Sequence, residues 1–598
     1  MNRILSRTLV GVGLLGFLVL SAAAQEPSAE RAESQFERAF YLEVHQNDLA
    51  GAAAVYEKVA ANSTAPEKLR AEAKTRLAGI REDLASAELA RLMPPEVIAY
   101  AHLAEPGEHV ERLLKLMGLV GPVPEGAADV KPFKLGGGLV LPADFTISPA
   151  LVDELKKLRG AAIGLTGIDK GGRPSGLVAV HPGNCNLLRG LIETAVQLLE
   201  PGEPIDGFKT YRVPDLGWVM ITNRLALAAD SRAELAAAAE RLRNPSAPSL
   251  ASSASFQKVA AEAKGSLLFA YVDGPAAVKR FGSQIDGQQG RMIRALLDLE
   301  HLESIVVTLT TNDQGISLAA QMNLMPGHKN MIYALVRTAP MTKRSLELVP
   351  QGAAGVLTIG LNPPGPAAPT VTNPDGTPSI SLMDVGRELF GNIDEVSVFA
   401  MAPAGDAQGR QPFPEIGAVI AVKDPAKSEA LWNQILSLAT LFGAKSAQPP
   451  TEAEIAGKKG SVYQFDGIPP IAVVRAGGVL VVGTRSAVTA AVQAGADGNS
   501  ILKDPLFAPL LARLTPNASK ALLIDAGRAM PIVAALAGGG SSDEMRLIGA
   551  LVHDMKISIV TDEAPNRLTI RADVTGLPKF RDIVMLLNGQ QRQAAAAK

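Results

Sequence analysis

The chain has 598 residues, of which 47% are apolar and 20% are charged, and its formal net charge at pH 7 is −2. This length exceeds what one hydrophobic core organises, so three or four domains are expected. The composition argues against extensive disorder, and the near-neutral charge gives no general attraction to nucleic acid or to an anionic membrane.

Residues 1–24 have the pattern of a signal peptide. Arg3 and Arg7 precede an apolar run at 9–20, and small residues at 21–24 form a cleavage site. The run is shorter than the ~20 residues of a membrane-spanning helix. We therefore expect cleavage after Ala24, export to the periplasm or the extracellular space, and no stable membrane span afterwards. An uncleaved membrane anchor is the alternative.

Residues 25–90 are predicted to be helical. Phe36, Phe40 and Val44 fall on one apolar stripe, and a later helix is expected to begin near Pro66. The segment AFYLEVHQNDLAGAAAVYEKVAA resembles a tetratricopeptide-type helical hairpin, with small residues at the helix crossing and a tyrosine beside it. A solenoid needs about three such repeats. This single unit is expected to cap the next domain or, alternatively, to dock a partner protein.

Residues 91–338 and 346–590 match each other at an offset of about 252 residues. The matching pairs are Asp273 with Asp525, His301 with His553, and Phe256 with Phe507. The matches predict a duplicated domain that kept its core while its surface changed.

Each repeat is expected to contain strand pairs, a helix, three short strands and a helix capped by Ser231 or Ser486. A strand ending in aspartate and a closing hairpin follow. Adjacent strands with short turns predict an antiparallel α+β fold rather than a doubly wound parallel sheet. The proline-rich stretch 361–381 is expected to be a loop, and 591–598 a disordered tail.

Both repeats carry a further common pattern. In the second it reads GGVLVVGTRSAVTAAVQ, then SILKDPLFAPLL, then the strand ALLID. The arrangement resembles a broad group of exported bacterial proteins of unknown function, and the resemblance covers most of residues 91–590. It implies an extracytoplasmic fold and brings no catalytic residues with it.

The single cysteine, Cys185, excludes an internal disulfide. It is predicted to lie at a helix start as a buried bystander rather than a reactive thiol.

The sequence shows no pattern of catalytic, cofactor-binding or metal-binding residues. Neither HxxxH nor HExxH occurs among the histidines, which are His45, His102, His109, His181, His301, His328 and His553. The string GRPSG at 172–176 lacks the spacing and context of a nucleophile elbow. The glycine runs at 136–138 and 538–540 lack the lysine of a phosphate-binding loop and are expected to be turns.

The duplicated polar residues favour structural roles. Asp273 and Asp525 end equivalent strands and are expected to cap the helices that follow. His301 and His553 precede equivalent strands and are expected to bond a turn or a helix end.

The sequence therefore predicts a non-enzymatic, exported scaffold or binding protein of the bacterial periplasm or cell surface, with no cofactor and an unidentified partner. The alternative is a carrier of an apolar small molecule or lipid in the cleft between the repeats. The third is a hydrolase whose site forms only in the fold. A carrier requires a deep apolar cavity, a scaffold an exposed apolar patch near Phe36 and Phe40, and a hydrolase clustered acids and histidines.

Overall fold

The computed structural model describes most of the chain from residue 28 onward. The described ranges are 28–44, 48–119, 133–134, 140–141, 147–168, 172–214, 217–244, 246–282, 288–361, 391–403, 413–427, 429–430, 432–433, 435–436, 449–465, 469–536, 543–580 and 582–583. The predicted signal peptide, His45, both glycine runs, most of the proline-rich loop and the tail lie outside these ranges.

The described residues form two compact units. Unit 1 comprises the residues up to Pro95 together with Glu105–Gly107 and Asp153–Ser253, and unit 2 comprises Glu96–Ala104, Glu108–Val152 and the chain from Ala254 onward. The stretch predicted as the first repeat therefore contributes strands to both units.

Unit 1 begins with three helices, α2 (Ser28–Val44), α3 (Leu49–Ala61) and α4 (Glu67–Ala87). Asp48 caps α3 by accepting a hydrogen bond from Gly51 N at 2.8 Å. Ala52 and Tyr56 are fully buried between the helices, as small and large residues at one crossing. The Tyr56 hydroxyl donates to Glu43 at 2.7 Å, so its polar end is satisfied.

The sheet of unit 1 is antiparallel and follows the order β4-β5-β9-β8-β7-β6. Its strands are β4 (Gly160–Ile168), β5 (Pro174–His181), β6 (Glu200–Pro201), β7 (Lys209–Val213), β8 (Gly217–Ile221) and β9 (Ala226–Ala229). The accompanying helices are α7 (Asn186–Gln197) and α8 (Arg232–Arg243), with short 3-10 turns η1 (Leu89–Arg91) and η3 (Leu250–Ser252). Arg224, in the turn before β9, donates to the carbonyl oxygen of Gly79 on α4 at 3.4 Å, which ties the helices to this sheet.

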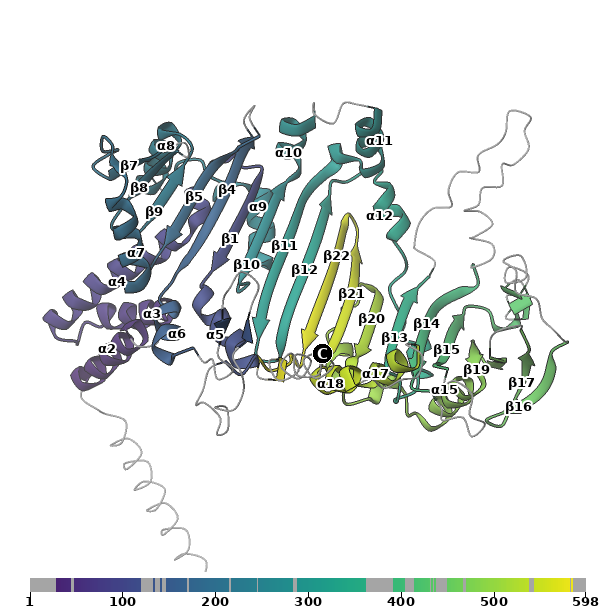
Figure 1. Cartoon of the computed structure of the whole chain (residues 1–598). Coiled ribbons are helices and arrows are strands. Elements are labelled where there is room, and N and C mark those ends of the chain that lie inside the picture. The colour runs from purple at the N-terminus through teal and green to yellow at the C-terminus, as the bar shows by residue number, and fades with distance from the viewer. Residues whose placement is uncertain are drawn as a thin grey trace, which may run out of the picture. The chain divides into compact units, whose positions relative to one another are not determined.

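The sheet of unit 2 is also antiparallel and follows the order β1-β10-β11-β12-β22-β21-β20-β13-β14-β15-β19-β18-β17-β16 (Figure 1). Its first strands are β1 (Ala99–Ala104), β10 (Leu268–Asp273), β11 (Leu302–Asn312) and β12 (Gly315–Leu324). The next are β13 (Gly355–Gly360), β14 (Ile393–Met401), β15 (Glu415–Val422), β16 (Thr451–Ile455), β17 (Lys458–Tyr463), β18 (Ile471–Ala476) and β19 (Val479–Thr484). The last are β20 (Ala518–Asp525), β21 (Lys556–Ala564) and β22 (Arg567–Thr575). Away from this sheet, β2 (Phe133–Lys134) pairs with β3 (Val140–Leu141).

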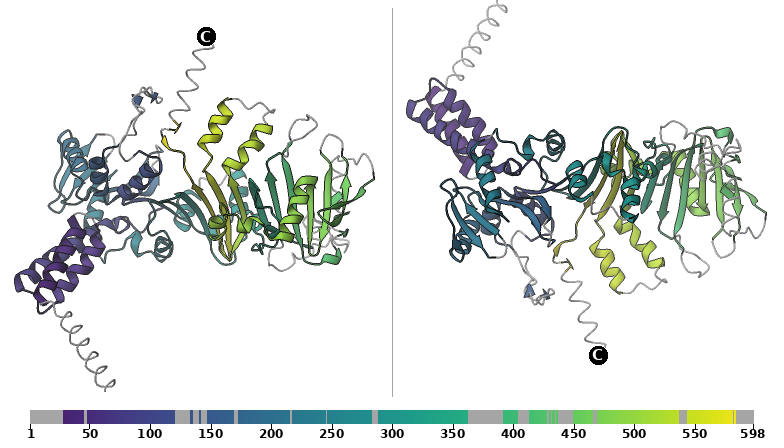
Figure 2. Two further views of the ribbon diagram at one scale, coloured as in Figure 1. Left: turned by 90° about the horizontal axis from the view of Figure 1, so that it is seen from below. Right: turned by 90° about the horizontal axis from the view of Figure 1, so that it is seen from above.

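The helices of unit 2 connect these strands. In the first half they are α9 (Ala254–Glu262), α10 (Gly274–Phe281), α11 (Gln288–Leu297) and α12 (Met331–Val336). Helices α5 (Pro106–Leu116) and α6 (Pro149–Lys156) each contain residues of both units. In the second half they are α15 (Arg485–Asp497), α16 (Ala508–Leu511), α17 (Ala526–Leu536) and α18 (Asp543–Leu551). The 3-10 turns are η5 (Leu299–His301), η6 (Ser345–Glu347), η7 (Pro425–Lys427) and η8 (Ile501–Lys503). Figure 2 shows α17 and α18, in yellow-green, standing out to one side of the sheet.

One face of this sheet packs against helices. Tyr100, Phe256 and Tyr271 form a cluster of edge-to-face aromatic contacts between β1, α9 and β10. On the other half, Phe507, Leu523 and helix α15 belong to a larger apolar core. The prediction of an antiparallel α+β fold is confirmed.

The two predicted serine caps have different outcomes. Ser231 caps α8 by accepting from Glu234 N at 3.2 Å, as predicted. The prediction for Ser486 is wrong, because β19 runs directly into α15 and Thr484 occupies the cap position. The Thr484 hydroxyl bonds Glu415 instead of the helix.

Candidate binding face

The two aspartates that the sequence analysis pairs, Asp273 and Asp525, occupy the same position relative to the helices that follow them. Asp273 accepts from Ala276 N at 2.8 Å, and Asp525 accepts from Arg528 N at 3.0 Å, which is the N-cap geometry at α10 and α17. Asp525 also lies 3.4 Å from the Lys556 ammonium group. Both carboxylates are therefore occupied by structural partners.

The two histidines that the sequence analysis pairs, His301 and His553, lie in turns. A ring nitrogen of His301 lies 2.9 Å from Asp298 within η5, and His553 lies in the turn between α18 and β21. No hydrogen bond given for the described residues joins either histidine ring to a nucleophilic side chain.

The other residues considered from the sequence lie on separate elements. Cys185 is buried at the start of α7. His102 lies on β1, whereas His109 on α5 bonds Thr311 at 2.8 Å. Within the described residues, no group of three or more histidine, cysteine or acidic side chains could hold a metal ion.

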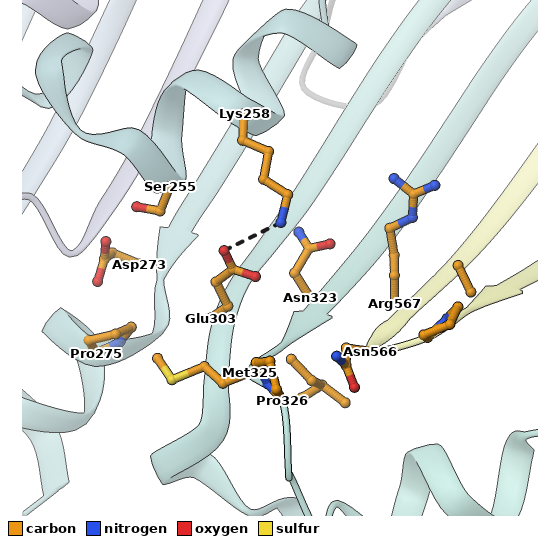
Figure 3. Close-up of a pocket in the computed structure, with 13 residues that line it drawn as sticks. Ser255, Lys258, Asp273, Pro275, Glu303, Asn323, Met325, Pro326, Asn566 and Arg567 are labelled. Carbon is orange, nitrogen blue, oxygen red and sulfur yellow. Dashed lines mark ion pairs between the residues drawn. The ribbon is translucent and has the colours of Figure 1, made fainter. Parts of the chain in front are cut away.

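A pocket of about 620 Å³ opens beside the Asp273 cap (Figure 3). Its lining comes from α9, β11, the end of β12 and the β21–β22 turn, and consists of Ser255, Lys258, Asp273, Pro275, Glu303, Asn323, Leu324, Met325, Pro326, Ala564, Pro565, Asn566 and Arg567. Lys258 pairs with Glu303 at 3.5 Å, the contact drawn as a dashed line in Figure 3. The lining mixes apolar side chains such as Leu324 and Met325 with the charged Lys258, Glu303 and Arg567, and so differs from the wholly apolar cavity that the carrier hypothesis requires.

The polar groups of this pocket are not arranged for acyl transfer. The Ser255 hydroxyl lies 3.1 Å from the Tyr271 hydroxyl, which donates to Asp273 at 2.9 Å. Burial raises the pKa of Tyr271, so the phenol stays protonated and cannot serve as the base for Ser255. Asn323 donates to the Ser304 hydroxyl at 2.9 Å and is likewise engaged.

The opposite face of the same sheet is apolar and partly open to solvent. Side chains directly opposite each other in antiparallel pairs point to the same face. The register places Ile305 opposite Met322, Leu318 opposite Ala572, and Ile570 opposite Ala320. The same row continues through Ile559, Leu522, Leu357, Val398 and Ile416. We call this row, from β11 to β15, the aliphatic face.

Exposure on the aliphatic face is unusual for its composition. The side chains of Ile305, Leu318, Leu357, Val398, Ile416, Ile559 and Ile570 are each between 38 and 46% exposed. On the opposite face, polar Ser304, Asn323, Ser558 and Asp573 are buried. Antiparallel sheets with one solvated face normally turn polar residues to water. In the central strands of unit 2 the apolar side is the more exposed one.

Helices contact the aliphatic face near both ends of the central strands. At one end, His109 of α5 bonds Thr311, which shares a face with Ile305 and stands opposite Ile316. At the other end, Tyr333 of α12 packs with Leu568, which stands opposite Met322. An ion pair between Lys520 and Glu563 at 2.6 Å lies near this second end. Helices α5 and α12 therefore contact the aliphatic face near the two ends of its central strands, and we call the open apolar row between these contacts the floor.

Sequence reasoning missed this face although its residues were visible. The alternation in LESIVVTLTTN and GISLAAQMNL gives apolar residues at every second position. Apolar positions on a strand are normally taken to be buried, so only the structure reveals that these lie open.

No helix in the described part of the chain combines the length and apolar character needed to cross a bilayer. No family model and no curated protein matches the chain. Two solved structures, titled crystal forms III and IV of TP0453, are similar in part. They are 11% and 13% identical to this chain, cover 42% and 44% of it and 88% and 87% of their own chains, and give TM-scores of 0.23 and 0.24. At these TM-scores the likeness establishes neither a family nor a function.

Proposed function

We propose that the protein is an exported, non-enzymatic binding protein that carries an apolar ligand on the aliphatic face. The observation that carries this proposal is the continuous row of half-open Ile, Leu and Val side chains across β11–β12–β22–β21 and onward to β15. Single exposed apolar residues are ordinary, but contiguous apolar patches mark binding surfaces. Covering the row removes apolar area from water, which stabilises a complex by about 25 cal/mol per Å².

The composition of the face favours a ligand over a protein partner. Protein interfaces are anchored by Tyr, Trp, Phe, Met and Arg side chains that fill pockets on the partner. The exposed floor positions are Ile, Leu and Val, whereas the aromatic residues Tyr271 and Phe399 lie on the packed face. The proposed ligand surface spans strands of both predicted repeats rather than a cleft between them.

A protein scaffold remains the second candidate because of helix α2. Phe40, Tyr41 and Val44 are 36, 53 and 51% exposed, close to the patch that the sequence predicts for a scaffold. The guanidinium group of Arg76 stacks over the Phe40 ring at 4.8 Å, which holds that ring in place.

The duplication is part of this proposal. We attribute residues 91–338 and 346–590 to one duplicated domain, preceded by a tetratricopeptide-like cap. The β10–β11 register sets Asp273 opposite Ser304, and the β20–β21 register sets Asp525 opposite Lys556, which keeps the same offset in both strands. Export rests on the residue pattern at 1–24, and membership of an exported bacterial group rests on the resemblance given above.

Dye binding tests the proposed function. The full-length gene is expressed, the product is stripped of bound apolar material, and titration with an anilinonaphthalene dye follows. Leu318→Gln combined with Ile570→Gln places two amides on the floor, and we expect at least about a fivefold loss of dye affinity. Leu198→Gln changes a leucine that is 84% exposed at the end of α7 and serves as the matched control. Equal dye binding by a folded double variant, judged by circular dichroism, would refute the proposal.

A further inference from the structure

We infer that the ligand is a lipid held by its straight acyl chains, with the chains lying on the floor around Leu318 and Ile570. The inference rests on the proposed function and names its ligand class. It follows from the chemistry of the floor, from its dimensions and from the helices that contact its two ends.

Most side chains of the floor offer contact without hydrogen bonds; the exception beside Ile570 is Thr561, which stands directly opposite it and is buried. On β11 the face positions Ile305, Val307 and Leu309 carry no donor or acceptor, and on β12 the same holds for Leu318 and Ala320. A ligand with buried polar groups loses free energy on such a surface, because those groups have no partner. A ligand with one polar end and a long apolar chain keeps its polar end in water and loses nothing.

The dimensions agree with acyl chains. From Ile305 to Leu309 a strand advances about 14 Å at ~3.4 Å per residue. One leaflet of a bilayer contributes about half of a ~30 Å hydrocarbon core, so its chains fill a similar length. From β11 to β15 the strands of the floor are spaced about 4.8 Å apart, which leaves room for more than one chain side by side.

The helices at its two ends argue against a second copy of the chain as the occupant of the floor. Two sheets that stack face to face stand about 10 Å apart. The α5 helix, which reaches Thr311 through His109, is itself about 10 Å thick and stands on the same side as the floor. At the opposite end, Tyr333 of α12 packs against Leu568 on the same side of the sheet. A second sheet that carries the same helices is kept from stacking directly on the floor, whereas a layer of acyl chains fits between α5 and α12.

The test is competition and transfer with the stripped, full-length gene product. The probe is cis-parinaric acid, a straight-chain fluorescent fatty acid, and the competitors are palmitate, dioleoylphosphatidylcholine and cholesterol. We expect saturable probe binding, displacement by the two straight-chain compounds and not by cholesterol, and at least about a fivefold weaker affinity in the Leu318→Gln and Ile570→Gln double variant. Leu198→Gln should bind like the parent protein.

The outcomes separate this inference from the proposed function. If the double variant binds the dye more weakly than the parent protein does, but only cholesterol displaces the parinaric acid, the acyl-chain inference fails and the binding function stands. If the double variant binds both the dye and parinaric acid as tightly as the parent protein does, the inference and the proposed function both fail. Incubation with phosphatidylcholine vesicles gives a further readout: soluble protein carrying lipid after the vesicles are removed supports the inference. Protein that binds vesicles and extracts nothing contradicts it, because the face then docks on a membrane.

Discussion

At the scale of single residues, the two capping aspartates have the same local role in different surroundings. Asp273 bonds a neutral tyrosine hydroxyl, whereas Asp525 lies among Arg528 and Lys556. Arg528 also bonds Asp504, which is fully buried. A cap alone contributes about 1 kcal/mol, but a buried carboxylate with cationic neighbours contributes more, since its loss removes an ion pair from Lys556 and weakens the charge balance around Arg528.

We therefore predict that Asp273→Ala lowers the free energy of unfolding by about 1 kcal/mol, and that Asp525→Ala lowers it by clearly more. The measurement is urea unfolding in a Trp218→Phe background. The sequence has two tryptophans, so the fluorescence then reports on Trp432 and on unit 2 alone. Equal losses in both variants would show that the cationic neighbours of Asp525 contribute nothing.

His181 gives unit 1 a predictable pH dependence. Burial lowers the pKa of His181 to about 4, and Arg159 and Arg189 add to the effect. An unfolded histidine titrates near pH 6.5, so between pH 6.5 and 4 the unfolded state binds more protons than the folded state. Stability contributed by neutral His181 is present above pH 6.5 and is lost as the pH falls toward 4.

We expect the urea midpoint of unit 1 to fall between pH 7 and pH 5, and to fall less in His181→Gln. The Trp432→Phe background leaves Trp218 of β8 as the fluorescent reporter. The substituted amide side chain cannot gain a proton in this range, which removes the cause of the decline. The same pH dependence in parent and variant would assign the effect to other groups.

At the scale of elements, the three N-terminal helices depend on one close crossing. Ala52 is fully buried beside Tyr56, and Ala54 on the same helix faces solvent. Overpacking a buried site costs about 1–3 kcal/mol. We predict that Ala52→Leu speeds tryptic cleavage within residues 28–87 by at least about fivefold, because cleavage follows local opening. Ala54→Leu should cleave like the parent, and a slow Ala52→Leu digest would contradict the tight crossing.

The local sequence pattern predicts most helices and strands. It does not predict helix and strand ends that depend on pairing with other strands. The strands at β7, β8 and β9 and the Ser231 cap follow from alternation and cap chemistry. The start of α15 does not, because strand β19 continues up to Thr484 through its pairing with β15 and β18. Strand β16, TEAEI, lacks a strong strand pattern and forms by pairing with β17.

At the scale of the molecule, the sequence predicted an α+β fold but not how the chain divides. Residues 91–338 read as one unit from their repeat pattern, yet β1 and β10–β12 join unit 2 while β4–β9 form the sheet of unit 1. Long-range pairing such as that between β12 and β22 has no local signal. The aliphatic face was hidden for the same reason, since no strand reveals what covers it.

That pairing predicts a gradient of protection across unit 2. Strand β22 is bonded on both sides, to β12 and β21, whereas the described strands bond β16 only to β17. In hydrogen exchange measured by mass spectrometry, we expect peptides of β22 to exchange far more slowly than peptides of β16. Faster exchange in β22 would indicate that the two halves of the sheet separate readily.

The pairing of β12 with β22 also has a consequence for biosynthesis. Ala319 stands directly opposite Arg571, which is 252 residues later in the chain. At about 5–20 residues per second, synthesis of the intervening chain takes roughly 13–50 s. During that interval β12 lacks its partner, with one edge unpaired and its apolar side chains uncovered, which is the condition under which strands aggregate. A nascent chain of this protein therefore needs protection in the cell until its last strand arrives.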